Sequence, residues 1–320
     1  MSVLVYLENW NGKFKKSTKE LLTYASDTAN LLGTEMVAVS IGNVTEDELK
    51  SLEPYGLGRV LSYSSDELGS FKAQAYTAAL HDACEKTNAS TVILGNTYNG
   101  KSMGPRLAAK WNASIATAVI SLPDTSNGFS VTRNVFSNKG FGHFSLIGER
   151  RVITLNGNSY KISENAGSLV VEDMSSFSAD AKPVNITDVK TQSGKIPLTE
   201  AELVVSAGRG LKGPENWTMI EELADLLNAG TACSKPVSDV GWRPHSEHVG
   251  QTGITISPNL YIAIGISGAI QHLAGVSSSK VICVINKDPE APFFKAADYG
   301  IVGDAFEVVP KLIEAVKALN

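Results

Sequence analysis

The chain has 320 residues, of which 43% are hydrophobic and 19% are charged. This composition is typical of globular proteins, and the length favours two domains over one. The formal net charge of −5 argues against non-specific binding to nucleic acid, which needs a surface rich in lysine and arginine.

Cysteine spacing and hydropathy narrow the class of protein further. Cys84, Cys233 and Cys283 lie far apart without a CxxC pattern, so they indicate neither a disulfide framework nor a zinc site. No apolar run reaches the roughly 18 residues of a membrane helix. A strand pattern begins at once, which leaves no room for a signal peptide. We therefore expect a bacterial cytoplasmic protein without membrane insertion; a trimmed protein of the mitochondrial matrix is the alternative.

The first 118 residues alternate strand and helix patterns, which predicts a parallel sheet with helices on both faces. Strands are predicted at 3–7, 36–41, 59–63 and 90–97, and helices at 18–32, 45–51, 70–86 and 101–113. Thr45 is the predicted N-cap of the second helix.

Residues 131–171 have a different pattern. Short runs rich in Thr, Val, Phe and Tyr are broken by turn residues, which predicts antiparallel hairpins added to the first sheet. The apolar patch at 184–189 is predicted to be a last strand followed by a linker. We place the domain boundary near Gly194, giving domains at 1–194 and 195–320.

The second domain repeats the alternation. Strands are predicted near 202–206, 231–234, 260–266, 281–286 and 298–304, and Asn216 is predicted to open the first helix. The chain ends in a predicted helix with Pro310 near its first turn and Leu312, Ile313, Val316 and Leu319 facing inward.

Unusual residues follow every strand of this second domain. Because parallel strands end at one edge of a sheet, we expect these residues to meet in a single crevice. The residues concerned are Arg209, Ser234, Lys235, Ser267 to His272, Asn286 and Asp304. The small residues at 265–268, followed by a helix pattern, predict a site for the pyrophosphate of a nucleotide.

Residue type suggests a role for each group. Arg209 between two glycines could bind phosphate, and Asp304 could accept hydrogen bonds from a ribose or adenine. Lys235 precedes a proline, so it is predicted to lie outside a regular helix and to point into the site. The simplest interpretation of His272 is a surface histidine; the alternative is a ligand-facing one. The sequence contains no nucleophile elbow, Walker loop, paired catalytic carboxylates or GxGxxG fingerprint, so a cofactor that carries the chemistry is favoured.

Three stretches closely resemble the α subunit of electron transfer flavoproteins, the ETF alpha or FixB family. They are VVSAGRGLKGPENW, VGQTGITISPNLYIAIGISGAIQHLAG and VICVINKDPEAPFFKAADYGIVGDAFEVVP, and they cover most of residues 202–312. The first domain is similar only in its order of strands and helices. The resemblance implies an α/β fold with two domains, each a mainly parallel sheet flanked by helices. The second would be a doubly wound, Rossmann-like or DHS-like domain that binds FAD.

The same resemblance implies roles for single residues. The FAD-binding set would be Arg209, Ser234, Lys235, Val249, Gly250, Gln251, Thr252, Ser267, Gly268, Ala269, Ile270, Gln271, His272, Asn286, Asp304 and Ala305. The loop Val249 to Thr252 would approach the flavin ring, with Thr252 near N5, while His272 would face O2 and Ser267 to Gln271 would wrap the pyrophosphate and ribityl. Asn286 and Asp304 would hold the adenosine. The family usually has Ser-Arg where this chain has Ser234-Lys235, which keeps the positive charge but loses the planar guanidinium.

The resemblance also implies partners. The family forms heterodimers with a β subunit, which the first domain would contact and which holds AMP or, in electron-bifurcating members, a second FAD. Electrons come from dehydrogenases, typically acyl-CoA dehydrogenases of fatty acid β-oxidation, and pass to a membrane quinone oxidoreductase or another acceptor. Three alternatives stay open: a subunit of a bifurcating flavoprotein, a nucleotide sensor without redox turnover and a free-standing flavin reductase.

Overall fold

The computed structural model describes residues 1–136, 140–179, 184, 186–188 and 196–319. The chain forms two compact units, one made of residues 1–135 and 141–190 and the other of residues 136–140 and 191–320. The predicted boundary at Gly194 and part of the strand predicted at 184–189 lie outside the described residues. Both units are α/β, as the sequence predicts, and each is built on a mainly parallel sheet.

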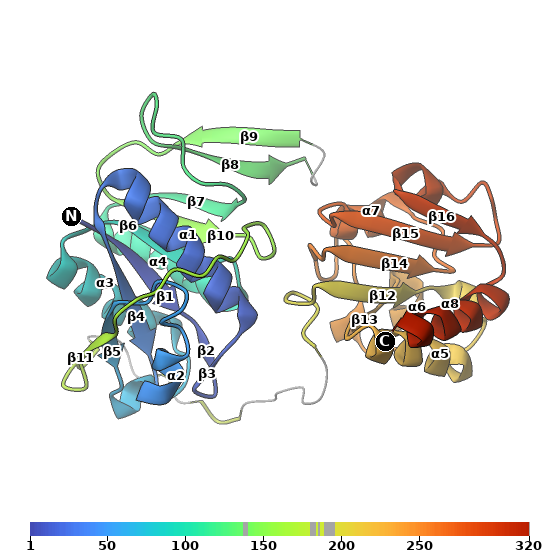
Figure 1. The fold of residues 1–320 in the computed structure, drawn as a ribbon, viewed down its shortest axis with the longest axis horizontal. Helices are drawn as coiled ribbons and strands as arrows, with labels where there is room; N and C mark the ends of the chain where they lie inside the picture. The colour runs from blue at the N-terminus through green and yellow to red at the C-terminus, as the bar shows by residue number, and fades with distance from the viewer. Residues whose placement is uncertain (137–139, 180–183, 185, 189–195, 320) are drawn as a thin grey trace. The chain divides into compact units, whose positions relative to one another are not determined.

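A nine-stranded sheet forms the centre of the first unit, in the order β11-β5-β4-β1-β6-β10-β7-β8-β9 (Figure 1). Its parallel strands are β1 (Ser2–Leu7), β4 (Glu35–Ile41), β5 (Arg59–Tyr63), β6 (Ala89–Gly95), β7 (Ser114–Val119), β10 (Arg151–Leu155) and β11 (Val170–Asp173). The strands β8 (Ser130–Val135) and β9 (Gly140–Ser145) complete one edge, and β8 pairs antiparallel to β7. A separate small ribbon consists of β2 (Asn9–Trp10) and β3 (Lys13–Phe14).

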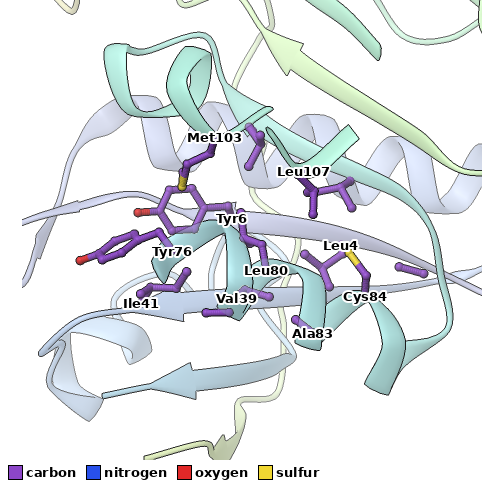
Figure 2. Close-up of a cluster of buried hydrophobic side chains, with 14 of the residues drawn as sticks. Leu4, Tyr6, Val39, Ile41, Tyr76, Leu80, Ala83, Cys84, Met103 and Leu107 are labelled. Carbon is purple, nitrogen blue, oxygen red and sulfur yellow. The ribbon is translucent and has the colours of Figure 1, made fainter. Parts of the chain in front are cut away.

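In the described part of the first unit, four helices cover this sheet: α1 (Lys16–Leu32), α2 (Glu46–Lys50), α3 (Ala73–Thr87) and α4 (Tyr98–Trp111). Side chains alternate between the two faces of a strand, so β1 serves two cores. Leu4 and Tyr6 pack with residues of α3 and α4 such as Leu80 and Leu107 (Figure 2). Val3, Val5 and Leu7 pack on the opposite face with residues of α1. This double burial explains why β1 is apolar at every position from Val3 to Leu7.

The hairpin prediction for 131–171 is correct only for β8 and β9. The strand β10 lies parallel between β6 and β7, and β11 lies parallel beside β5 at the opposite edge. Short runs with Gly and Asn turns are therefore compatible with long crossovers as well as with hairpins.

The second unit has a five-stranded parallel sheet in the order β13-β12-β14-β15-β16. The strands are β12 (Leu203–Ala207), β13 (Gly230–Cys233), β14 (Leu260–Ile264), β15 (Val281–Asn286) and β16 (Tyr299–Val302). The helices are α5 (Thr218–Leu226), α6 (Lys235–Asp239), α7 (Ile270–Val276) and α8 (Ala305–Leu319). Residues of α5 and α8 share one buried cluster with the sheet, and residues of α7 share the other.

Three local predictions about the helices α5 and α8 are wrong. Leu319 is 86% exposed, because the last turn of α8 runs past the core. Pro310 is the sixth residue of α8 and so lies beyond its first turn. Asn216 lies in a short 3-10 turn, Pro214–Trp217, and α5 begins only at Thr218; the Asn216 side chain donates to the Leu211 carbonyl instead.

Candidate functional site

All five strands of the second unit end at the same edge of the sheet, because all of their pairings are parallel. From β12 the chain continues to β13 on one side and then crosses to β14 on the other side of β12. The order of the strands therefore reverses between β12 and β14, which are neighbours in the sheet. Such a switch point is where open α/β sheets bind ligands. From β13 to β16 the edge spans about 19 Å at the usual strand spacing, a length that suits an elongated dinucleotide better than a single phosphate.

Glycines bring the backbones that follow β12 and β14 together at this switch point. The Gly208 N–H donates to the Ile264 carbonyl at 2.9 Å, and the Gly210 N–H donates to the Gly265 carbonyl at 3.1 Å. A β-carbon at Gly210 would lie 2.7 Å from the Cα of Gly265, which itself has a φ of +60°. No other residue type fits this contact without movement. Arg209 is therefore held at the exposed rim of the edge.

The turn after β14 is fixed in a similar way. Gly268 has a φ of +84°, and a β-carbon there would lie 2.6 Å from the backbone N of Phe293. The Phe293 N–H donates to the Ser267 carbonyl at 3.1 Å. Ser267, Ala269, Ile270 and Gln271 are exposed. The turn thus places four exposed residues at the middle of the edge.

The loop from Val249 to Thr252 packs on α7. The Gln251 N–H donates to the Gln271 carbonyl at 2.7 Å, and the backbone of Gly250 lies so close to Gly275 that a β-carbon at residue 275 would be 2.5 Å from it. Val249 is fully buried, whereas Gln251 and Thr252 are exposed. The structure therefore places Gln251 and Thr252, which are predicted to approach the flavin ring, on a loop held by α7. We call residues Val249 to Thr252 the anchored loop.

His272 is buried, with 6% of its surface exposed, so the surface-histidine interpretation is wrong. Its Nε2 lies 2.8 Å from the hydroxyl oxygen of Tyr261, a core residue of β14. Its Nδ1 is buried and has no hydrogen-bond partner in the described part of the chain. Burial, followed by the charge of nearby His248, lowers the pKa of His272 to about 4, partly offset by the Val249 backbone. The imidazole is consequently neutral near pH 7.

The remaining predicted residues lie towards the two ends of the edge. The Asn286 amide donates to the Ile266 carbonyl at 3.0 Å, which ties β15 to the switch point. Asp304 precedes α8, and its carboxylate accepts the N–H of Phe306 at 3.0 Å; Ala305 follows as a buried first residue of the helix. These groups lie on the β16 side.

Ser234 and Lys235 follow β13 on the other side. Ser234 is 6% exposed, and Lys235 is exposed. Lys235 is the first residue of α6, so the expectation that it lies outside a regular helix is wrong. The following proline is tolerated because N–H groups in the first turn have no partner within the helix.

Comparison with protein families covers both units. Residues 3–188 match the electron transfer flavoprotein domain, and residues 197–277 match the electron transfer flavoprotein FAD-binding domain. The chain belongs to the electron transfer flavoprotein family. For the first unit, the sequence by itself shows similarity only in the order of strands and helices. The match to the family domain over residues 3–188 is more specific than that.

Relatives of the same family span nearly the whole chain. The electron transfer flavoprotein subunit alpha of Bacillus subtilis is 37% identical over 322 residues, covering 99% of this chain and 98% of that protein. The corresponding subunit of Syntrophomonas wolfei is 36% identical and covers 98% of each chain. Protein FixB of Clostridium saccharobutylicum is 32% identical, covering 99% of this chain and 96% of its own length.

The FAD-binding domain match includes the switch point, the anchored loop and α7, and the residues there fit a flavin nucleotide. Two features support the fit: exposed residues lie on a rim whose glycines are tightly packed, and the buried Nδ1 of His272 lacks a hydrogen-bond partner among the described residues. Among the described residues no helix has both the length and the apolar character to cross a bilayer.

The structure adds residues that the sequence patterns did not single out. Tyr261 is the partner of His272, and Phe293 holds the turn at Ser267. His248 directly precedes the anchored loop and lies next to Gly250 of the loop and to Gly253, which follows it. Only its position directly before Val249 could have suggested a role for His248.

Proposed function

We propose that this chain is the α subunit of a heterodimeric electron transfer flavoprotein that holds FAD at the carboxyl edge of its second sheet. FAD would supply the redox chemistry, because its ring accepts and releases electrons one or two at a time. The observation that carries the proposal is the switch point between β12 and β14, which lies inside the segment matching the FAD-binding domain.

Each predicted residue has a place in this arrangement. Gln251 and Thr252 would meet the flavin ring near the β13 side, with Ser234 and Lys235 supplying a hydroxyl and a cation there. The rim from Ser267 to Gln271, together with Arg209, would hold the pyrophosphate. Asn286, Asp304 and Ala305 would hold the adenosine on the β16 side. The order of the strands supports this direction, since β13 and β16 lie at opposite edges of the sheet.

The proposed partners follow from the family. A β subunit would complete the heterodimer through the first unit and would carry AMP or a second FAD. Acyl-CoA dehydrogenases or other dehydrogenases would donate electrons, and a quinone oxidoreductase or another acceptor would receive them. The exposed rim supports such transfer, because an electron carrier must bring its cofactor close to a partner's surface.

Coexpression with a β-type subunit tests the proposal. The purified complex should be yellow, and a redox titration should count one flavin, or two if the β subunit carries its own. A colourless complex that shows no bound-flavin spectrum after FAD is added would overturn the proposal.

A second experiment tests the role of His272. His272→Ala should make the bound flavin harder to reduce, because a hydrogen-bond donor to the electron-rich ring is lost. Tyr261→Phe is the matched control, since it removes only the hydroxyl that holds Nε2; the flavin should then be reduced at least as easily as in the wild type. An unchanged or higher potential for His272→Ala would count against the assignment.

A further inference from the structure

His248 is a second buried histidine beside the anchored loop. Only 7% of its surface is exposed. Its backbone is fixed on both sides: its carbonyl accepts the Ile254 N–H at 2.9 Å, and its N–H donates to the His245 carbonyl at 3.1 Å. Neither contact involves the imidazole, and the ring makes no hydrogen bond within the described residues.

The imidazole of His248 lies against the two glycines of the turn. A β-carbon at Gly253 would be 2.8 Å from Nδ1, and one at Gly250 would be 3.4 Å from Nε2. Gly250 and Gly253 are themselves joined, because the Gly253 N–H donates to the Gly250 carbonyl at 3.1 Å. The ring therefore supports the segment that presents Gln251 and Thr252 at the surface.

The charges around His248 disfavour a protonated ring. Lys235 and Asp239 face it from α6, His245 from the turn before it and His272 from α7. Burial lowers the pKa of His248; Lys235 and His245 lower it further, and only Asp239 opposes them. A proton on His248 would also place a positive charge beside His272.

We propose that His248 is a positioning residue of the FAD site: its uncharged imidazole supports the turn from Val249 to Gly253 and so fixes Gln251 and Thr252 at the flavin ring. This inference rests on the proposed function, because it concerns the same site. The inference adds His248 to the residues of the site, as a side chain that contacts the loop without facing FAD. It also predicts that FAD binding depends on pH. Protonation of His248 would repel the neighbouring cations and disturb the loop.

The experiment uses the full chain coexpressed with a β-type subunit, in the wild type and in three variants. His248→Ala removes the support, His248→Gln keeps a polar side chain of similar length without a titrating group, and His245→Ala is the control at a neighbouring, exposed histidine. FAD affinity is measured by fluorescence titration of the flavin-free complex between pH 5 and pH 8. Histidine NMR on the flavin-free complex reports the titration of His272 separately.

We expect His248→Ala to weaken FAD binding about tenfold or more and His248→Gln and His245→Ala to change it by less than about threefold at pH 7.5. In the wild type and His245→Ala the affinity should fall as the pH drops below the ordinary histidine pKa of about 6.5, whereas in His248→Gln it should stay flatter. Wild-type affinity in His248→Ala, a His248→Gln variant as weak as His248→Ala, or equal pH profiles would overturn the inference.

The NMR arm separates this inference from the proposed function. If the wild-type complex binds no FAD, the proposed function fails, and the inference is then judged by His272 alone. An upward shift of the His272 titration in His248→Gln supports the coupling of the two rings, and an unchanged titration overturns it.

Discussion

Replacing Gly275 with alanine is expected to weaken FAD binding by pushing the anchored loop away from α7. The new β-carbon would lie 2.5 Å from both the Cα and the N of Gly250, whereas non-bonded carbon atoms need about 3.5–4.0 Å. The loop or the helix must therefore move by about 1 Å. No side chain can absorb this change, because both contacting atoms belong to the backbone.

The size of the effect follows from three terms. Alanine in place of a helical glycine favours folding by about 1 kcal/mol, and overpacking costs about 1–3 kcal/mol; the net loss of stability is then about 0–2 kcal/mol. The moved loop would also strain the 2.7 Å bond from Gln251 to Gln271. If Gln251 and Thr252 each lose one flavin contact worth about 1 kcal/mol, the dissociation constant of FAD should rise about 30-fold.

Fluorescence titration of the flavin-free complex with FAD measures the affinity, and thermal melting measures the stability. Gly104→Ala in α4 is the matched control: it is also a helical glycine, but its β-carbon would meet only side-chain atoms, at 3.4–3.5 Å. This control should be as stable as the wild type or slightly more stable, with unchanged FAD affinity. A Gly275→Ala complex that binds FAD as tightly as the wild type would refute the role of the anchored loop.

Three further predictions concern stability. Glu20→Ala should lower the free energy of unfolding by about 2–4 kcal/mol, because this buried carboxylate accepts the backbone N–H groups of residues 158–160; a loss below about 0.5 kcal/mol in urea denaturation would contradict it. Asp304→Ala should lower the free energy of unfolding by about 1 kcal/mol, because the N-cap of α8 is lost. Asp304→Asn should keep most of that stability, as measured by thermal melting. Lowering the pH from 7 to 4 should lower the free energy of unfolding by up to about 3 kcal/mol because of His272. The pKa of His272 falls from 6.5 to about 4 on folding, so the unfolded chain takes up the proton first as the pH drops. This contribution is complete above pH 6.5 and decreases as the pH falls towards 4; His272→Gln should flatten that part of the profile, and an equal slope would contradict the assignment.

The second sheet could be predicted from the sequence because its elements follow one another regularly. Each apolar run there is followed by a helix or turn, so a parallel sheet results from the usual crossover. The first sheet was harder, because β10 inserts between β6 and β7. Such an insertion depends on contacts between residues distant in the chain, and no local pattern records those contacts.

The candidate site shows the same division between local and distant contacts. The convergence of strand ends follows from parallel pairing alone, and the structure confirms that they share one edge. The environment of His272 could not be predicted from the sequence. Its partner Tyr261 belongs to a buried apolar strand, and the pattern of that strand does not indicate which of its residues contacts His272. The helix start at Lys235 does not follow from the sequence for a different reason: the proline after it argues against a helix interior, yet prolines are common in a first helical turn.

The position of β10 also has a consequence for synthesis on the ribosome. A nascent chain that ends before Arg151 contains β6 and β7 but not the strand that joins them. Both strands would then expose unpaired backbone edges, which are sites of aggregation. We therefore expect a fragment of residues 1–150, which lacks β10 and β11, to aggregate when expressed alone and a fragment of residues 1–179 to be much more soluble, so that the sheet of the first unit is completed only after both strands have left the ribosome.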